Sequence, residues 1–252
     1  MSIHTSSALL LRKIRFRNTS YIIDILTENR GRTTLIAKGA RREKSGFFGC
    51  LDFCSLLEIV FIDKPDAMGM LTSCDVASYF AGIHRSRRRL ACSMLFVRMV
   101  REFVQDRETD TGLFRVCSSF FSDIHFCDES GILETYISYL LVLLDLSGFR
   151  PECSRCSVCG ASLGLSETIM FDREGGEMFC RECRYEKKDK KYLELSSKTC
   201  IIIDTLQIGK HTAGISFSHR DMLSAERFLL EFASSVLNKD LRSVSIRLYD
   251  AE

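Results

Sequence analysis

The sequence predicts an α+β fold: five short strands close a small N-terminal barrel, and a helical region with an inserted four-cysteine hairpin follows. Three observations predict this fold. Apolar residues alternate with polar ones up to about residue 75, they recur at helical spacing from about residue 86, and two Cys-x2-Cys pairs interrupt the helical part. We expect the domains to be residues 1–80 and 81–252, with the cysteine segment at residues 153–185.

The five strands are short and rich in apolar and β-branched residues. They are expected at residues 8–14, 21–27, 33–37, 54–62 and 68–73, separated by Gly, Asn and Pro residues. Five strands of this length have the dimensions of an oligonucleotide-binding (OB) fold, which is a small closed barrel. A small barrel or sandwich that binds no ligand would have the same strand pattern.

The helices are predicted from apolar residues spaced three and four apart. We expect them at about residues 86–106, 133–144 and 224–237. Gly148 and Pro151 should end the second helix, and Ser218 or Ser224 should cap the start of the third.

Four cysteines carry the strongest chemical signal. Cys156 and Cys159 are followed, after twenty residues, by Cys180 and Cys183, which is the spacing of a tetrathiolate zinc site. Each pair makes a tight turn that directs two thiolates inward, and Gly160 suits the positive φ of the first turn. The pattern predicts a structural Zn²⁺, because a catalytic zinc ion keeps one position for water.

The segment between the two pairs is expected to form a hairpin, with Gly175 and Gly176 at its turn. An iron–sulfur cluster also uses thiolates, but its ligands usually lie closer together in the sequence. Cys153 lies three residues before Cys156 and would shift the ligand set if it bound the metal. We interpret Cys153 as a neighbour of the site and not as a ligand.

Composition indicates a globular protein of the reducing cytoplasm. The chain has 252 residues, 46% of them apolar, and lacks a long uninterrupted apolar segment, so we expect neither secretion nor membrane insertion. Eight of the twelve cysteines lie outside the two pairs, mostly in apolar surroundings, as reduced core thiols do.

Positive charge is concentrated at the N-terminus. The whole chain has a net charge of +2, whereas its first fifty residues hold ten basic and three acidic residues, a net charge of +7. This asymmetry predicts a polyanionic partner for the N-terminal domain. Strand alternation places Lys13 on the opposite face from Arg12, so the charges do not all share one surface.

A basic loop follows the third predicted strand. Lysines and arginines there would contact phosphates through charge, independently of base sequence. A solvated charged loop is the alternative interpretation. The predicted DNA-binding residues are Lys38, Arg41, Arg42 and Lys44, extended by Arg12, Arg15, Arg17 and Arg32.

Two further groups of residues have two interpretations each. Phe47 and Phe48 follow the basic loop and would either stack on bases or, as we prefer, belong to the barrel core or its lid. The arginines at 85 and 87–89 open a predicted helix, where they would contact DNA, an acidic partner segment or solvent.

Taken in order, these motifs resemble the RecO family of bacterial recombination mediators. The resemblance covers nearly the whole chain and includes the two cysteine pairs. The matching segments are Ala8–Arg12, Leu26–Glu28 with Gly31, Ala37–Arg42 with Lys44 and Ser45, Leu146–Pro151, Gly175–Gly176 and Asp240–Ser243.

The resemblance implies a non-enzymatic protein that binds single- and double-stranded DNA, anneals complementary strands and helps to load recombinase onto DNA coated with single-strand-binding protein. It implies RecR and the C-terminal tail of the single-strand-binding protein as partners, and it leaves open a need for RecF. Such a protein works in the cytoplasm, at the nucleoid and not at a membrane.

Two other classes of function remain open from the residues themselves. One is a zinc-containing enzyme that processes DNA or RNA, although the five histidines are dispersed and no phosphate-binding loop or nucleophile elbow is found. Magnesium-dependent cleavage would favour that class. The other is a scaffold that binds only protein, which a failure to bind nucleic acid at low salt would favour.

Overall fold

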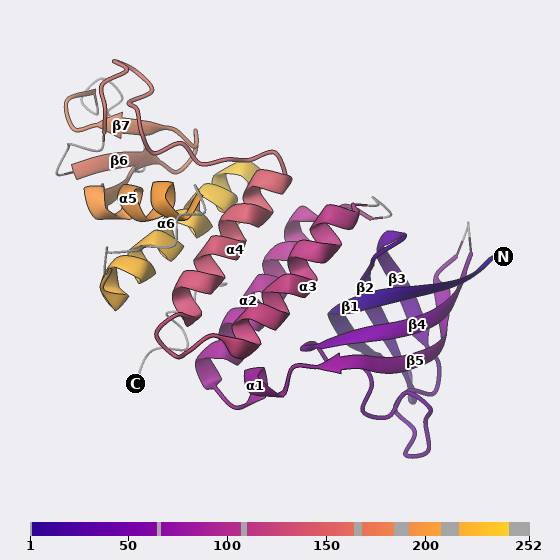
Figure 1. Cartoon of the computed structure of the whole chain (residues 1–252). Helices are drawn as coiled ribbons and strands as arrows, with labels where there is room; N and C mark the ends of the chain where they lie inside the picture. The colour runs from indigo at the N-terminus through magenta and orange to yellow at the C-terminus, as the bar shows by residue number, and fades with distance from the viewer. Residues whose placement is uncertain are drawn as a thin grey trace. The chain divides into compact units, whose positions relative to one another are not determined.

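The structure is a computed structural model that describes residues 2–64, 67–106, 110–163, 168–183, 192–207 and 217–241 (Figure 1). Two compact units make up the chain, residues 1–132 and 133–252. Each unit is described by itself below. The expected division at residue 80 stays a prediction; it lies directly after the last barrel strand, which ends at Tyr79.

The first unit begins with five strands, as predicted. They are β1 (Ser2–Phe16), β2 (Ser20–Thr27), β3 (Gly31–Ala37), β4 (Ser55–Asp63) and β5 (Gly69–Tyr79). The strands form a closed sheet in the order β1-β2-β3-β5-β4, and β1 also pairs with β4. All pairings are antiparallel except β3 with β5, which is parallel.

Two strands are longer than predicted. Residues Ser2–Ser7 of β1 pair with β4 up to Asp63, although their sequence is mostly polar. β5 continues from Ser73 to Tyr79 with mostly exposed residues along β4. Partner strands hold these segments by backbone hydrogen bonds, which side-chain alternation does not reveal.

The barrel core comes from alternate residues of every strand. Its buried members include Leu10, Ile23, Ile25, Leu35, Leu57, Ile59, Phe61 and Leu71. Alternation is clearest in β3, where every second residue is buried. Because the strand period is two, this pattern fixes which residues face outward.

Three helices follow in the described part of the first unit: α1 (Ala81–His84), α2 (Arg87–Phe103) and α3 (Thr111–Phe126). Ser86 caps α2, and Val104 follows it in extended backbone, so this helix ends before the predicted residue 106. The prediction did not include α3. Its buried face contains three phenylalanines, Phe114, Phe120 and Phe121, and the Asp110 side chain caps its start by accepting from Gly112 and Leu113.

The second unit contains α4 (Ile132–Leu146), β6 (Thr168–Asp172), β7 (Met178–Cys180), β8 (Tyr192–Ser196), α5 (Ser197–Gln207) and α6 (His219–Leu237). β6 lies between β7 and β8 in a three-stranded antiparallel sheet. The predicted hairpin is β6–β7, and Gly176 turns it with φ +70°. β8 and α5 were not predicted.

Ser218, one of the two predicted caps, begins α6. Its side chain accepts from Asp221 N–H, and the Asp221 carboxylate accepts from Ser218 N–H, which completes a capping box. None of the described helices combines the length and the apolar character needed to cross a bilayer.

Candidate metal centre and nucleic-acid interface

The four predicted cysteines come together in the second unit. The Sγ atoms of Cys156, Cys159, Cys180 and Cys183 all lie within 4.8 Å of one another. The Cys159 and Cys180 Sγ atoms are 3.8 Å apart. Two thiolates at about 2.3 Å from a tetrahedral zinc ion would be about 3.8 Å apart, so the donor set fits this metal in type, number and spacing.

Local backbone contacts hold the two cysteine pairs in place. Gly160 N–H donates to Cys156 C=O at 3.0 Å, and Gly160 has the predicted positive φ, +70°. Ser157 N–H donates to Met178 C=O at 2.9 Å, which joins the first turn to β7, where Cys180 is the last residue. The cluster is therefore formed by one turn and one hairpin end.

Backbone N–H groups favour the thiolate form of Cys156. Burial raises the pKa of Cys156, but N–H groups of Cys159, Cys180 and Val158, together with the Cys159 thiol, outweigh burial and lower that pKa to about 6. A thiolate is the form of cysteine that binds metal.

Cys153 lies outside this cluster. It is buried, and a hydrogen bond with the Cys200 thiol, burial and the nearby Asp204 charge raise its pKa well above the ordinary value. Cys153 therefore belongs to a buried thiol pair. Residues 164–167 and 184–185 of the expected cysteine segment lie outside the described residues.

The basic loop, residues 38–54 between β3 and β4, lies beside the β1–β2 turn, residues 17–19. Arg41 joins the two: its N–H donates to Thr19 C=O, and its Nη1 donates to the carbonyls of Arg17 and Asn18 at 3.2 and 3.1 Å. Six of the eight predicted DNA-binding residues are exposed on these two segments or next to them. They are Arg15, Arg17, Lys38, Arg41, Arg42 and Lys44.

The turn itself has an unusual backbone. Arg17 has φ +50°, in the left-handed region that non-glycine residues seldom adopt. Its guanidinium lies over the Phe16 ring, 5.2 Å from the centroid. The strained turn orients the Arg17 carbonyl toward Arg41 and leaves the Arg17 charge exposed.

A cavity of about 440 Å³ opens at this surface, between the basic loop and β1–β2. Its lining includes Lys13, Tyr21, Arg41, Arg42 and Phe48. Lys13 Nζ donates to Leu51 C=O at 2.6 Å and lies over the Tyr21 and Phe53 rings.

Phe47 and Phe48 differ in their surroundings. Phe47 packs against the barrel core, which confirms the core interpretation for this residue. Phe48 is 77% exposed, so it does not belong to the barrel core. An exposed aromatic ring beside two arginines is the arrangement that single-stranded DNA binders offer to bases.

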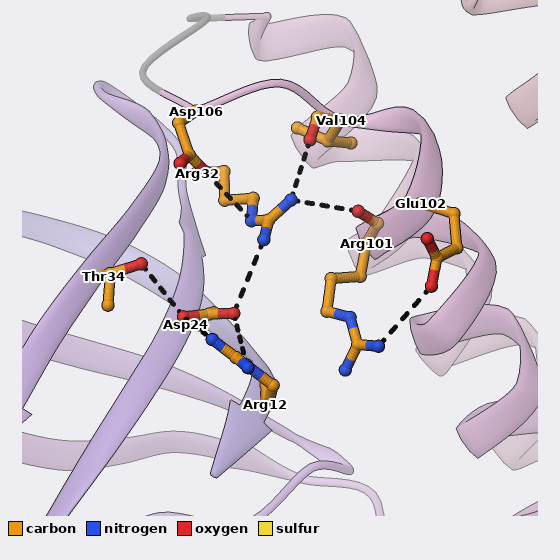
Figure 2. Close-up of polar contacts among 8 residues, drawn as sticks. All are labelled: Arg12, Asp24, Arg32, Thr34, Arg101, Glu102, Val104 and Asp106. Atoms are coloured by element: carbon orange, nitrogen blue, oxygen red, sulfur yellow. Dashed lines mark hydrogen bonds and ion pairs between the residues drawn. The ribbon is translucent and has the colours of Figure 1, made fainter. Parts of the chain in front are cut away.

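The other two predicted DNA-binding residues, Arg12 and Arg32, face Asp24 (Figure 2). Asp24 is fully buried on β2, and its carboxylate accepts from Arg12 Nε at 2.7 Å and from Thr34 Oγ1 at 3.0 Å. Arg32 Nη2 lies 3.5 Å from the same carboxylate, and Arg32 Nη1 donates to the carbonyls of Arg101 and Val104. Arg32 thereby links the sheet to the end of α2 and has only 20% of its side chain exposed.

The arginines at the start of α2 also have partners within the first unit. Arg89 Nη2 donates to Cys127 C=O at 2.6 Å and forms an ion pair with Glu129. These contacts stabilise the junction of α2 with the end of α3.

Sequence reasoning did not identify Asp24 as a site residue. The only signal is an acidic residue within the apolar run Tyr21–Leu26. An acid in such a strand is expected to have a basic partner, since an unpaired buried charge is costly. The sequence does not specify that partner.

Two models of known protein families match this chain, and their matches include residues of both units. The family model described as "Recombination protein O N terminal" matches residues 1–80, and "Recombination protein O C terminal" matches residues 84–245. The first match contains the barrel strands and the basic loop, and the second contains all four clustered cysteines.

Curated relatives are similar over most of the chain. A DNA repair protein RecO of Rhodopirellula baltica is 35% identical over 179 residues, which are 70% of this chain and 66% of that relative. The RecO protein of Syntrophus aciditrophicus is 26% identical over 96% of this chain and 94% of its own length. The RecO protein of Desulfosudis oleivorans is 28% identical over 75% of this chain and 74% of its own length. The two family models together cover more than half of the sequence, and the chain therefore belongs to the RecO family of DNA repair proteins.

Proposed function

We propose that this protein is a non-enzymatic mediator of DNA repair and recombination that binds single- and double-stranded DNA and anneals complementary strands. The N-terminal barrel acts as an OB fold in this proposal. Its DNA-binding surface is formed by the basic loop and the β1–β2 turn.

One observation supports this proposal above the others: the contact of Arg41 with the carbonyls of Arg17 and Asn18. It joins two segments that are each basic and exposed. Lys38, Arg42 and Lys44 approach DNA from the loop, while Arg15 and Arg17 approach from the β1–β2 turn. Arg12 and Arg32 have a structural role instead, since both face Asp24.

Annealing by such a surface needs no chemical step. Two DNA strands repel each other, and a cationic surface that holds both raises their rate of encounter. Phosphate contacts of lysine and arginine are independent of base sequence, as annealing of arbitrary strands requires. Phe48 adds a stacking surface that every base can use.

Cys156, Cys159, Cys180 and Cys183 would hold a structural Zn²⁺. The ion would link the turn at 156–160 to the end of β7. All four donors are thiolates, so the site offers no position for water or substrate, and its contribution is to folding.

The names of the relatives support a role in DNA repair, and the family resemblance extends the proposal to loading recombinase onto DNA that carries single-strand-binding protein. RecR and the C-terminal tail of the single-strand-binding protein are the proposed partners, and RecF is a further partner to be tested. The proposed location is the cytoplasm, at the nucleoid.

The test is the annealing rate of two labelled complementary DNA strands without nucleotide, with the wild-type protein and with Arg42→Ala/Lys44→Ala. This pair is preferred to one that includes Arg41, because Arg41 also holds the β1–β2 turn. We expect acceleration by the wild-type protein, weaker acceleration at higher salt, and a clear loss in the double variant.

Arg115→Ala/Arg220→Ala is the matched control, because it removes two exposed charges from helices α3 and α6. Its annealing rate should equal that of the wild type. Equal loss in both double variants would indicate an effect of total charge, and the absence of annealing by folded protein would favour a protein-binding scaffold. Magnesium-dependent strand cleavage would favour an enzyme.

A further inference from the structure

Three side chains outside the four-cysteine cluster form a second group of metal-ligand atoms. Asp52 and Cys54 lie at the end of the basic loop, and His84 is the last residue of α1. One potential ligand atom from each lies within 4.8 Å of the other two. All three residues belong to the first unit.

We propose that Asp52, Cys54 and His84 bind a second zinc ion, which fastens the end of the basic loop to α1. The proposal concerns a site separate from the four cysteines. Its consequence for DNA binding rests on the function proposed above, whereas the metal site itself does not.

The distance between two of the groups suits a shared ion better than a direct bond. His84 Nε2 and Asp52 Oδ1 are 3.5 Å apart, which is long for a hydrogen bond between these atoms. With zinc–nitrogen and zinc–oxygen distances of about 2.0–2.1 Å, two ligands of a tetrahedral ion are about 3.4 Å apart. The two side chains already have the separation that coordination requires.

Cys54 supplies the donor that favours zinc. The residue is 1% exposed, and no hydrogen bond reaches its Sγ from the residues that the structure describes. A sulfur, an imidazole nitrogen and a carboxylate oxygen form a mixed donor set that suits zinc, whereas magnesium and calcium prefer oxygen alone.

Neighbouring groups orient the ligands. Asp52 Oδ1 accepts from Cys54 N–H at 2.8 Å, which holds the carboxylate beside the thiol. The His84 ring stacks on Tyr79, with centroids 5.3 Å apart and planes 15° apart. The Asp52 and His84 side chains are 34% and 33% exposed, so an ion can enter from solvent, and water completes its coordination.

The site lies where a bound ion can restrict the basic loop. Asp52 also lines the cavity that contains Arg41, Arg42 and Phe48. An ion held by Asp52, Cys54 and His84 would restrict the end of the loop that carries these residues. Zinc should therefore slow exchange of backbone amides in the loop.

The first experiment counts zinc. Reduced full-length protein is loaded with zinc, unbound metal is removed by gel filtration, and zinc is measured per chain. We expect two zinc ions per chain for the wild type and one for His84→Ala and for Asp52→Asn, with circular dichroism of both variants unchanged. His4→Ala, which removes a histidine of β1, is the matched control and should keep two.

A second experiment compares hydrogen exchange of residues 40–51 in zinc-loaded wild-type protein and His84→Ala. Exchange should be faster in the variant by several-fold. The same zinc count in the wild type and both variants would overturn the proposal, whatever the occupancy of the four-cysteine site. Neither measurement uses DNA, so loss of DNA annealing with two zinc ions present would count against the proposed function alone.

Discussion

Arg12 of β1 and Asp24 of β2 form an ion pair across adjacent strands, with Arg12 Nε 2.7 Å from Asp24 Oδ2 (Figure 2). The carboxylate is fully buried, whereas 39% of the arginine side chain is exposed. Arg32 and Thr34 of β3 contact the same carboxylate, so one acidic group connects three strands. Arg12 and Arg32 therefore have structural contacts within the barrel, and their role in DNA binding stays a prediction to be tested.

Asp24→Asn should destabilise the protein. The variant removes the charge that both arginines face but keeps the size of the side chain. We expect a loss of about 1–3 kcal/mol in the free energy of unfolding, below the loss of about 3–5 kcal/mol for a fully buried pair because Arg12 is partly exposed. Urea denaturation of both proteins measures this loss of stability. Asp75→Asn, on the exposed part of β5, should change little, and equal stability of Asp24→Asn and wild type would contradict the structural role.

Asp24 should also make stability depend on acid pH. Burial raises its pKa, but hydrogen bonds from Arg12 and Thr34 and the charges of Arg12 and Arg32 outweigh burial and hold the pKa below 3.8. A lowered pKa in the folded state stabilises the protein above the unfolded-state value, and this contribution disappears as the pH falls through the folded-state value.

The measurement is urea denaturation at several pH values from neutrality to below 4, for the wild type and Asp24→Asn. The difference in stability between them should be constant near neutrality and shrink below about pH 4. A difference that stays constant into strong acid would show that the carboxylate charge is not responsible.

Arg42 and Arg32 should differ in how their loss affects DNA binding. Arg42→Ala removes an exposed cation of the basic loop, so the slope of log affinity against log salt should fall by about 0.7–0.9 for each lost phosphate contact. Arg32→Ala should lower stability and leave that slope unchanged, because its guanidinium faces Asp24, Asp106 and the end of α2. Fluorescence anisotropy at several salt concentrations measures both slopes. A reduced slope for Arg32→Ala would return this residue to the DNA-binding surface.

Phe48→Ala should weaken binding of single-stranded DNA with little effect on stability. The ring is 77% exposed, and loss of one stacked base costs about 1–3 kcal/mol in binding free energy. Phe47→Ala is the comparison: it should lower the free energy of unfolding, because Phe47 packs against the barrel core. Unchanged affinity of Phe48→Ala for a short oligothymidine would exclude stacking on this ring.

Features that depend on residues close together in the sequence could be predicted from it. The core strands alternate in side-chain type with the period of a half-buried strand, and each Cys-x2-Cys pair forms its turn locally. Contacts between residues far apart in the sequence could not be predicted in this way. Asp24 meets Arg12 and Arg32 only after β1, β2 and β3 pair in register, and Asp52 meets His84 through the packing of a loop end beside α1. The spacing of apolar residues along the sequence does not show which distant side chains will meet.

The last prediction separates the roles of two neighbouring cysteines. Cys153→Ser should leave the amount of zinc unchanged, since Cys153 pairs with Cys200 and lies outside the cluster. Cys180→Ser should lower the zinc content by one ion per chain and destabilise the second unit, because Cys180 ends β7 and a site with three thiolates holds zinc less tightly. Zinc content and thermal unfolding of both variants provide the test, with Cys117→Ser, a substitution at a buried thiol of α3, as the control. Loss of zinc in Cys153→Ser would contradict this assignment and move the first ligand pair three residues toward the N-terminus, to Cys153 and Cys156.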